Sequence, residues 1–175
     1  HVIEYPPRTN RTDTDSSKSG LLTWGAAYVG IYWSDEFYNS PSSAYYMPEN
    51  AKNTSTGGGH GVTLIGWNNT FPASAFNETP PGDGAWIVKN SWGSAWGEEG
   101  YFYVSYYDKY IGSALDSEGT YRSTAFFTGE PVDNYQEAYL HDPLGSCRQY
   151  YINTPKTGTM AARYMAKEAG ELSAI

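Results

Sequence analysis

The 175-residue sequence predicts a mainly antiparallel, barrel-like β-sheet with one short helix. Aromatic residues make up 17% of the chain, and Tyr is far more frequent than Phe or Trp. Such side chains are enriched in strands. The 19 Gly and 10 Pro residues favour turns and short elements over long helices. We expect the sheet to occupy residues 19–128 and the helix to lie near residues 13–24.

The first elements follow from chain breakers and apolar runs. Residues 1–12 should be extended, because two consecutive prolines disfavour a helix. Residues 13–24 begin with Asp and Ser candidates for an N-cap, and Gly25 is a stop signal. Residues 26–33 form a run of apolar and aromatic residues through Ile31 and Trp33, which predicts a strand. Residues 34–58 are rich in Ser, Asn, Pro and Gly without periodicity, which predicts a long surface loop.

The rest of the sheet should come from four later apolar runs. These strands are predicted at residues 60–68, 85–91, 101–107 and 120–127. In the first of them Val62, Leu64 and Trp67 should lie near one face. A composition change at Pro131 predicts a domain boundary, with one domain at 1–130 and a second beginning at 131–175.

Bulk composition excludes several classes of protein. The net charge is −8 and no Lys/Arg-rich patch is present, so no nucleic-acid partner is expected. No apolar run approaches the roughly 20 residues that span a bilayer. The single cysteine, Cys147, allows neither an intrachain disulfide nor a Cys-based zinc site. No cofactor and no metal are expected.

The surface composition indicates an exported protein. The chain is acidic, rich in Tyr and nearly free of cysteine, which is typical of a secreted or cell-surface protein of a prokaryote. It opens at "HVIEYPPRTN" without a signal peptide, so we interpret it as the interior of a longer polypeptide. N-x-[ST] triplets, which also arise by chance, begin at Asn10, Asn53, Asn68 and Asn77.

Two polar residues at neighbouring strands are the candidates for chemistry. His60 opens the apolar strand 60–68, and Asn90 ends the next one. If these strands are antiparallel neighbours, the side chains can meet. An Asn amide oxygen would hold the imidazole in one tautomer and leave its other nitrogen free. That nitrogen could take the proton of a thiol and create a thiolate nucleophile.

Two blocks of sequence resemble a known enzyme family. "HGVTLIGWN" and "GAWIVKNSWGSAWGEEGYFYVSYYD" resemble the His and Asn blocks of papain-like cysteine peptidases. "SGLLTWGAAYVGIYW" is similar to the family's helix and strand before the His block, so the match covers residues 13–108. The resemblance implies an α+β papain-like fold, of which this chain carries mainly the C-terminal, β-rich half.

The resemblance also implies roles for four residues. His60 would be the general base and acid, and Asn90 would orient it. Trp92 would shield the His–Asn hydrogen bond from water, and Trp96 would line the leaving-group side of the substrate cleft. The substrate would be a protein or peptide.

The sequence departs from the family at two places. Gly59 stands where the family has Asp or Asn before the His, and no Gln…Cys-Gly-Ser-Cys-Trp stretch is present. Cys147 lies downstream of the Asn block and lacks the family's flanking pattern, so it is interpreted as a buried or idle thiol. The nucleophile should then lie in an upstream helical half, on the same or a separate chain.

The C-terminal residues carry a shorter resemblance. "VDNYQEAYLHDPLG" resembles the start of the lectin-like module that follows the peptidase domain in some bacterial and archaeal surface enzymes. It implies a β-rich module and a cell-wall or surface glycan as a further partner. Asp133, Glu137 and Asp142 could suggest a calcium site, but they lack EF-hand spacing.

Three functions remain open from the sequence. The chain could be part of a working cysteine endopeptidase completed by the upstream half. It could be a non-catalytic homologue that binds peptide or glycan, or a structural protein of the cell surface that keeps the fold as a scaffold. The residue at the position of the family cysteine distinguishes the first function from the other two.

Overall fold

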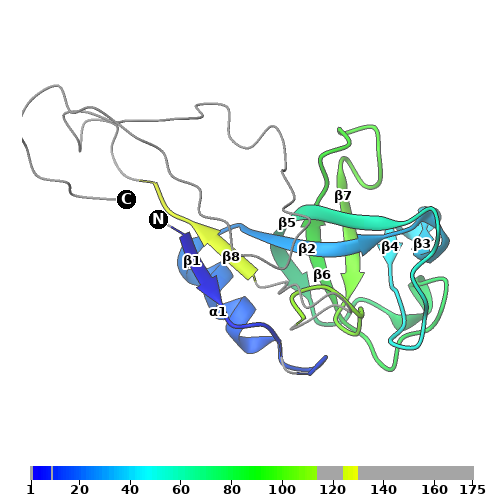
Figure 1. The fold of residues 1–175 in the computed structure, drawn as a ribbon, viewed down its shortest axis with the longest axis horizontal. Helices are drawn as coiled ribbons and strands as arrows, with labels where there is room; N and C mark the ends of the chain where they lie inside the picture. Colours follow the sequence, from blue (N-terminus) through cyan, green and yellow to red (C-terminus); the bar gives the residue numbers. More distant parts are fainter. Residues whose placement is uncertain (1, 9, 114–123, 130–175) are drawn as a thin grey trace, which may run out of the picture. The chain divides into compact units, whose positions relative to one another are not determined.

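The computed structural model describes residues 2–8, 10–113 and 124–129 (Figure 1). Its one α-helix among these residues, α1 (Asp15–Trp24), lies close to the predicted position and ends at Gly25, which has a φ of +86°. The strands are β1 (Val2–Tyr5), β2 (Ala27–Trp33), β3 (Tyr38–Asn39), β4 (Ala44–Tyr45), β5 (Gly58–Asn68), β6 (Ala85–Lys89), β7 (Tyr101–Ser105) and β8 (Thr124–Phe127). Short 3-10 helices cover Asp35–Phe37, Ser40–Ser42 and Ala73–Ala75.

All eight strands of the described residues belong to one sheet, in the order β1-β8-β2-β5-β6-β7-β4-β3. The predicted antiparallel pairing is confirmed for most neighbours, and the exception is the parallel pair of β4 and β7. The barrel-like closure was wrong. In the described part of the chain β1 and β3 are the two edges of an open sheet, so the strands do not close on themselves (Figure 1).

The core lies on one face of the four central strands. Through the middle of β2, β5, β6 and β7, buried residues recur at every second position, as expected for strands with one covered face. These residues are Val29, Ile31, Val62, Leu64, Trp86, Val88, Phe102 and Val104. His60 continues the alternation of Val62 and Leu64 toward the start of β5, and its register partner is Ile31. The histidine is therefore placed at the end of the core face.

A β-bulge in β5 keeps the side chain of Trp67, near the end of the strand, on this core face. Leu64 pairs with Val88 and Gly66 with Ile87, so Ile65 is an extra residue without a partner on β6. The extra residue brings Trp67 opposite Trp86, on the same face as Leu64. The prediction that Val62, Leu64 and Trp67 share a face is confirmed, although the spacing from Leu64 to Trp67 is odd.

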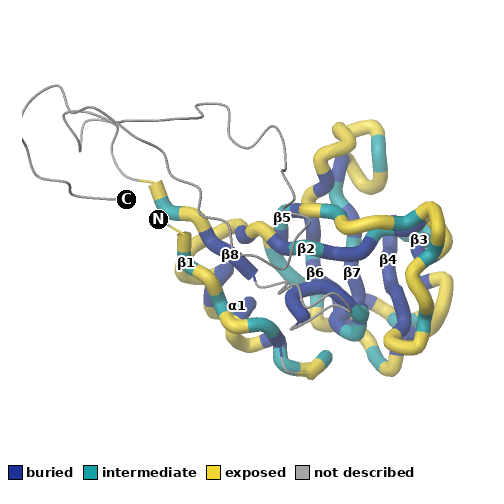
Figure 2. The backbone as a smooth tube through the Cα atoms, in the orientation of Figure 1, coloured by how far each residue is buried: buried dark blue, intermediate teal, exposed yellow. Residues whose placement is uncertain are grey.

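The prediction of a long surface loop at residues 34–58 was wrong. This segment contains β3, β4 and two 3-10 helices, and it buries Phe37, Tyr45 and Met47 (Figure 2). Its strands are only two residues long, so they leave no periodic pattern in the sequence. The segment is anchored to the sheet because β4 pairs with β7.

The remaining predictions fall partly outside the described residues. β6 and β7 end at Lys89 and Ser105, each two residues before the predicted ends. β8 covers the second half of the predicted strand 120–127. Residues 131–175, with Cys147 and the proposed second module, lie outside the described residues, so that domain boundary stays a prediction. No described helix is long and apolar enough to cross a membrane.

Two buried ionisable side chains, Arg8 and Asp108, hold the turn after β7 in place. The Arg8 guanidinium donates to the backbone carbonyls of Asp13 (2.8 Å), Tyr106 (2.8 Å), Ile111 (3.3 Å) and Arg11. Burial, with the nearby Arg11, lowers the pKa of Arg8 to about 10. The fully buried Asp108 carboxylate accepts backbone N–H bonds from Met47, Tyr110 and Ile111 at 2.9–3.0 Å, and burial raises its pKa.

Tyr106 should make the stability of this region depend on alkaline pH. Its hydroxyl donates to Asn69 Oδ1 at 2.8 Å, and burial raises its pKa from 10.0 to about 12. Because the folded protein holds this proton more tightly than the unfolded chain, the stabilisation is complete below pH 10 and is lost as pH rises toward about 12. Urea unfolding of the full-length protein should show a steeper loss over this range than unfolding of Tyr106→Phe. Parallel pH profiles of the two proteins would contradict the expectation.

Candidate active site

The candidate site is built around His60, which follows three glycines at the start of β5. His60 is half-buried, and a Cβ added at Gly58 or Gly59 would meet nothing within 4 Å. Gly59, where the family has Asp or Asn, therefore leaves open space next to the histidine. His60 is thus held in the sheet, whereas no other described residue packs over Gly58 and Gly59 just before it.

Asn90 meets His60 as predicted. The residue directly follows β6, and its backbone N–H donates to the carbonyl of Gly100 at 2.9 Å. His60 Nε2 lies 2.9 Å from Asn90 Oδ1. Asn90 is only 6% exposed, so this hydrogen bond is sheltered from water.

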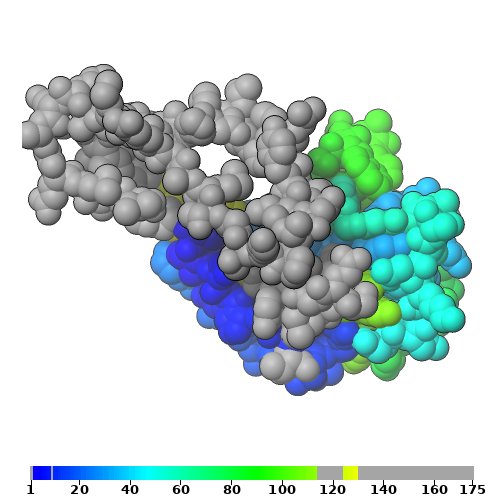
Figure 3. All heavy atoms as spheres, in the orientation of Figure 1, coloured from blue at the N-terminus to red at the C-terminus, as the bar shows by residue number. Residues whose placement is uncertain are grey.

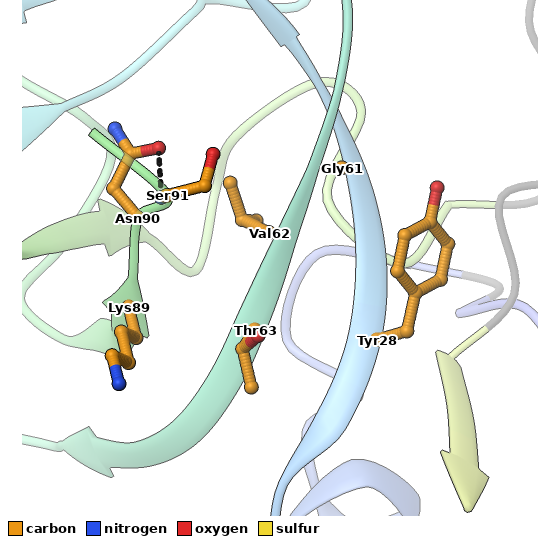
Figure 4. Close-up of a pocket in the computed structure, with 7 residues that line it drawn as sticks. All are labelled: Tyr28, Gly61, Val62, Thr63, Lys89, Asn90 and Ser91. Carbon is orange, nitrogen blue, oxygen red and sulfur yellow. Dashed lines mark hydrogen bonds between the residues drawn. The ribbon is translucent and has the colours of Figure 1, made fainter. Parts of the chain in front are cut away.

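A second hydrogen bond determines the histidine tautomer. Asn90 Oδ1 also accepts the backbone N–H of Ser91 at 2.8 Å (Figure 4). A backbone N–H can only donate, so the oxygen of the amide must face it. The same oxygen then requires a proton on Nε2 of His60, which leaves Nδ1 as the nitrogen able to accept a proton. The buried Nδ2 of Asn90 has no hydrogen-bond partner among the described residues.

Trp92 and Trp96 lie in the turn between β6 and β7, which projects as the green lobe in Figure 3. The Trp92 ring stacks on His60 with centroids 5.0 Å apart and an angle of 25° between the planes. Trp96 packs edge-on against Trp92 at 5.0 Å and stacks on Tyr38 at 5.0 Å. Trp92 is 44% exposed, so one side of it covers the histidine and another faces solvent.

Sequence reasoning missed Trp33 as a member of the site. Its ring lies 4.8–6.3 Å from six aromatic rings, which belong to Tyr38, Tyr45, His60, Trp92, Trp96 and Phe102. Its indole N–H donates to Asp35 at 2.9 Å. Trp33 thereby joins the histidine to the tryptophan turn and to the core. The available signal was its position two residues after Ile31, on the strand that pairs with β5.

An open depression lies beside Asn90 (Figure 4). Its lining residues are Tyr28, Gly61, Val62, Thr63, Lys89, Asn90 and Ser91. Asn90 contributes to this lining, whereas His60 does not. The described residues contain no group of three or more His, Cys, Asp and Glu side chains that could hold a metal ion. The acidic residues Asp133, Glu137 and Asp142 lie outside them.

Comparison of the sequence with known protein families identifies the family of the chain. The family described as papain family cysteine protease matches residues 4–120, more than half of the chain. The chain therefore belongs to the papain family of cysteine proteases, and the predicted resemblance is confirmed.

Its similar proteins are cysteine proteinases. Cathepsin B-like cysteine proteinase 5 of Caenorhabditis elegans is 34% identical over 84 residues, which cover 48% of this chain and 20% of that protein. A cathepsin L-like peptidase of Aedes aegypti is 32% identical over 91 residues, 51% of this chain and 23% of that protein. The chain thus spans about a fifth of the length of these relatives.

The solved structures support the fold. The cysteine protease and lectin-like domains of Cwp84, a surface layer associated protein of Clostridium difficile, match with a TM-score of 0.53 and 25% identity. The match covers 71% of this chain and 24% of that one. A second structure, of a substituted clostridial cysteine protease Cwp84 after propeptide cleavage, matches with a TM-score of 0.56 at 24% identity. This second match covers 73% of this chain and 28% of that one, and it shows the fold alone.

Proposed function

We propose that this chain supplies the histidine and asparagine of a cysteine endopeptidase that hydrolyses peptide bonds. The observation that carries the proposal is the pair of hydrogen bonds to Asn90 Oδ1, one from Ser91 N–H and one from His60 Nε2. They leave Nδ1 as the proton acceptor in a half-buried ring. Such a nitrogen activates a thiol.

The thiol would come from a segment outside this sequence, in the helical half of the peptidase. The short span of the chain relative to its relatives supports this assignment. Nδ1 of His60 would take the thiol proton, and the thiolate would attack the peptide carbonyl. The imidazolium would protonate the amine as the C–N bond breaks, which leaves an acyl-enzyme. The neutral ring would then activate the water that hydrolyses the thioester.

The roles proposed for the two tryptophans follow from their contacts. The stacking of Trp92 on His60 would keep water from competing for the histidine–asparagine bond. Trp96 would line the leaving-group side of the cleft, beside Trp92. The surface location and the glycan-binding module at residues 131–175 remain part of the proposal. They are supported by the similarity to the cysteine protease and lectin-like domains of Cwp84, a surface layer associated protein.

Replacing Asn90 tests the orienting role. In the full-length protein, Asn90→Ala should lower kcat/KM for a peptide substrate by one to a few tenfold steps, each worth about 1.4 kcal/mol. The imidazole keeps its chemistry but loses its fixed tautomer and orientation. Trp92→Ala should give a similar loss, because water would reach the hydrogen bond. Asn69→Ala is the matched control, since Asn69 accepts bonds from Lys18 and Tyr106 and touches neither His60 nor Asn90 in the described structure, and it should leave kcat/KM unchanged.

Alkylation of the thiol by iodoacetamide distinguishes peptidase function from a binding or scaffold role. A peptidase should lose activity in step with alkylation of one thiol, and bound peptide substrate should slow the alkylation. Peptide binding without hydrolysis, or activity that survives full alkylation, would contradict the proposal.

A further inference from the structure

The four N-x-[ST] triplets, which the peptidase mechanism does not use, differ sharply in their hydrogen bonding. Asn10 Oδ1 accepts the backbone N–H of Thr12 at 3.0 Å and its hydroxyl at 2.9 Å. Asn68 Oδ1 accepts the same two groups of Thr70, both at 3.0 Å. In both triplets the asparagine and the hydroxyl two residues later are therefore already joined in one turn.

The side chain of the middle residue anchors each of these two turns to another segment of the chain. Arg11 pairs with Glu49. Asn69 accepts hydrogen bonds from Lys18 Nζ at 2.9 Å and from the Tyr106 hydroxyl at 2.8 Å. The Nδ2 atoms of the two triplet asparagines have no acceptor among the described residues, and both threonines are exposed.

The other two triplets are engaged differently. Asn77 Nδ2 donates to the backbone carbonyls of Tyr38 at 3.0 Å and Glu36 at 3.4 Å. Asn53 Oδ1 accepts the hydroxyl of Tyr110 at 2.8 Å. No hydrogen bond joins Asn53 to Ser55, or Asn77 to Thr79, in the described part of the chain. The nitrogen of Asn77 is used by the fold, and the amide of Asn53 is turned toward a buried tyrosine.

We propose that Asn10 and Asn68 carry N-linked glycans, and that Asn53 and Asn77 do not. The donor would be a glycan linked to a lipid phosphate, used by a membrane glycosyltransferase. Nδ2 of the asparagine would form a bond to C1 of the first sugar and lose one proton to a base of that enzyme. The C1–O bond to the phosphate would break, and the lipid phosphate would leave with the electron pair. The inference depends on the export that the proposed function includes.

A preformed turn favours this transfer for a physical reason. The glycosyltransferase must hold the asparagine amide and the hydroxyl of the triplet together, and fixing that geometry from a flexible chain costs conformational entropy. Asn10 and Asn68 already have it. Asn77 would first have to break its two bonds to the segment that contains β3, and Asn53 would have to release Tyr110. Folded structure therefore selects two acceptors from four triplets that all fit N-x-[ST].

Peptide mapping by mass spectrometry of the full-length protein from its own host tests the assignment. Glycan should be found on Asn10 and on Asn68 and should be absent from Asn53 and Asn77. Thr12→Ala and Thr70→Ala should each remove the mass of one glycan. Thr12→Ser and Thr70→Ser, which keep the hydroxyl, should retain it. An unmodified Asn10 or Asn68, or glycan on Asn53 or Asn77, would overturn the proposal.

The peptidase activity of the same preparations keeps the two proposals apart. None of the four variants touches His60 or Asn90, so their kcat/KM should equal that of the unchanged protein. Glycans at the expected asparagines without peptidase activity would reject the proposed function alone. Peptidase activity without these glycans would reject the glycan sites alone.

Discussion

His60→Ala should remove nearly all peptidase activity from the full-length protein, a loss on the order of 1,000-fold or more in kcat/KM. The thiol would lose both its proton acceptor and the imidazolium that stabilises the thiolate. The thiol pKa should consequently rise toward the ordinary value of about 8.5. Rates of iodoacetamide alkylation measured against pH report that shift directly.

His60→Gln is the matched control for this substitution. A glutamine amide can still hydrogen-bond to Asn90 Oδ1, which accepts from His60 Nε2 in the native structure, but it cannot take a proton at neutral pH. We expect it to be as inactive as His60→Ala, because the loss comes from proton transfer. If either variant kept the native rate and the native alkylation profile, the peptidase mechanism would be wrong for this protein.

Asp108→Ala should lower the free energy of unfolding by several kcal/mol. Three buried backbone N–H groups, those of Met47, Tyr110 and Ile111, would lose their acceptor. Each unsatisfied buried donor costs about 1–3 kcal/mol. Arg8 would also lose a nearby negative charge that raises its pKa. Denaturant unfolding followed by tryptophan fluorescence would measure the change, since five tryptophans lie in the core or around the site.

Asp83→Ala is the comparison for the stability experiment. Asp83 is exposed and accepts one backbone N–H, that of Ala73 at 2.8 Å. Its loss should cost about 1 kcal/mol or less, because water can replace the carboxylate. Equal destabilisation by the two substitutions would show that burial of Asp108 does not set the size of the effect.

The residues of the site that could be predicted from the sequence are those that lie in short, local sequence patterns. His60 and Asn90 stand at the ends of two apolar strands, and a single loop between antiparallel neighbours brings them together. Trp33 could not be recognised in this way. Its role depends on six rings from separate segments of the chain, and only the folded sheet assembles them.

The fold was predicted correctly where strands are long, and the prediction failed where strands are short. β2, β5, β6 and β7 have five or more residues, enough to display alternation. β3 and β4 have two each, and the buried Phe37 and Met47 beside them resemble isolated apolar residues in a loop. A sheet closes into a barrel only if its two edge strands, here β1 and β3, pair with each other. The residue pattern within a strand does not encode that pairing.

Ile65, the extra residue of the β-bulge, determines where β5 can lose a residue without moving His60 off the core face. Side chains along a strand alternate in phase, so removing one residue between His60 and Leu64 would rotate the imidazole to the opposite face, away from Asn90. Removing Ile65 would instead leave both halves of β5 in phase, because Ile65 has no partner on β6. A one-residue deletion at Ile65 is thus compatible with the catalytic pair, and the residues between His60 and Leu64 have no such freedom.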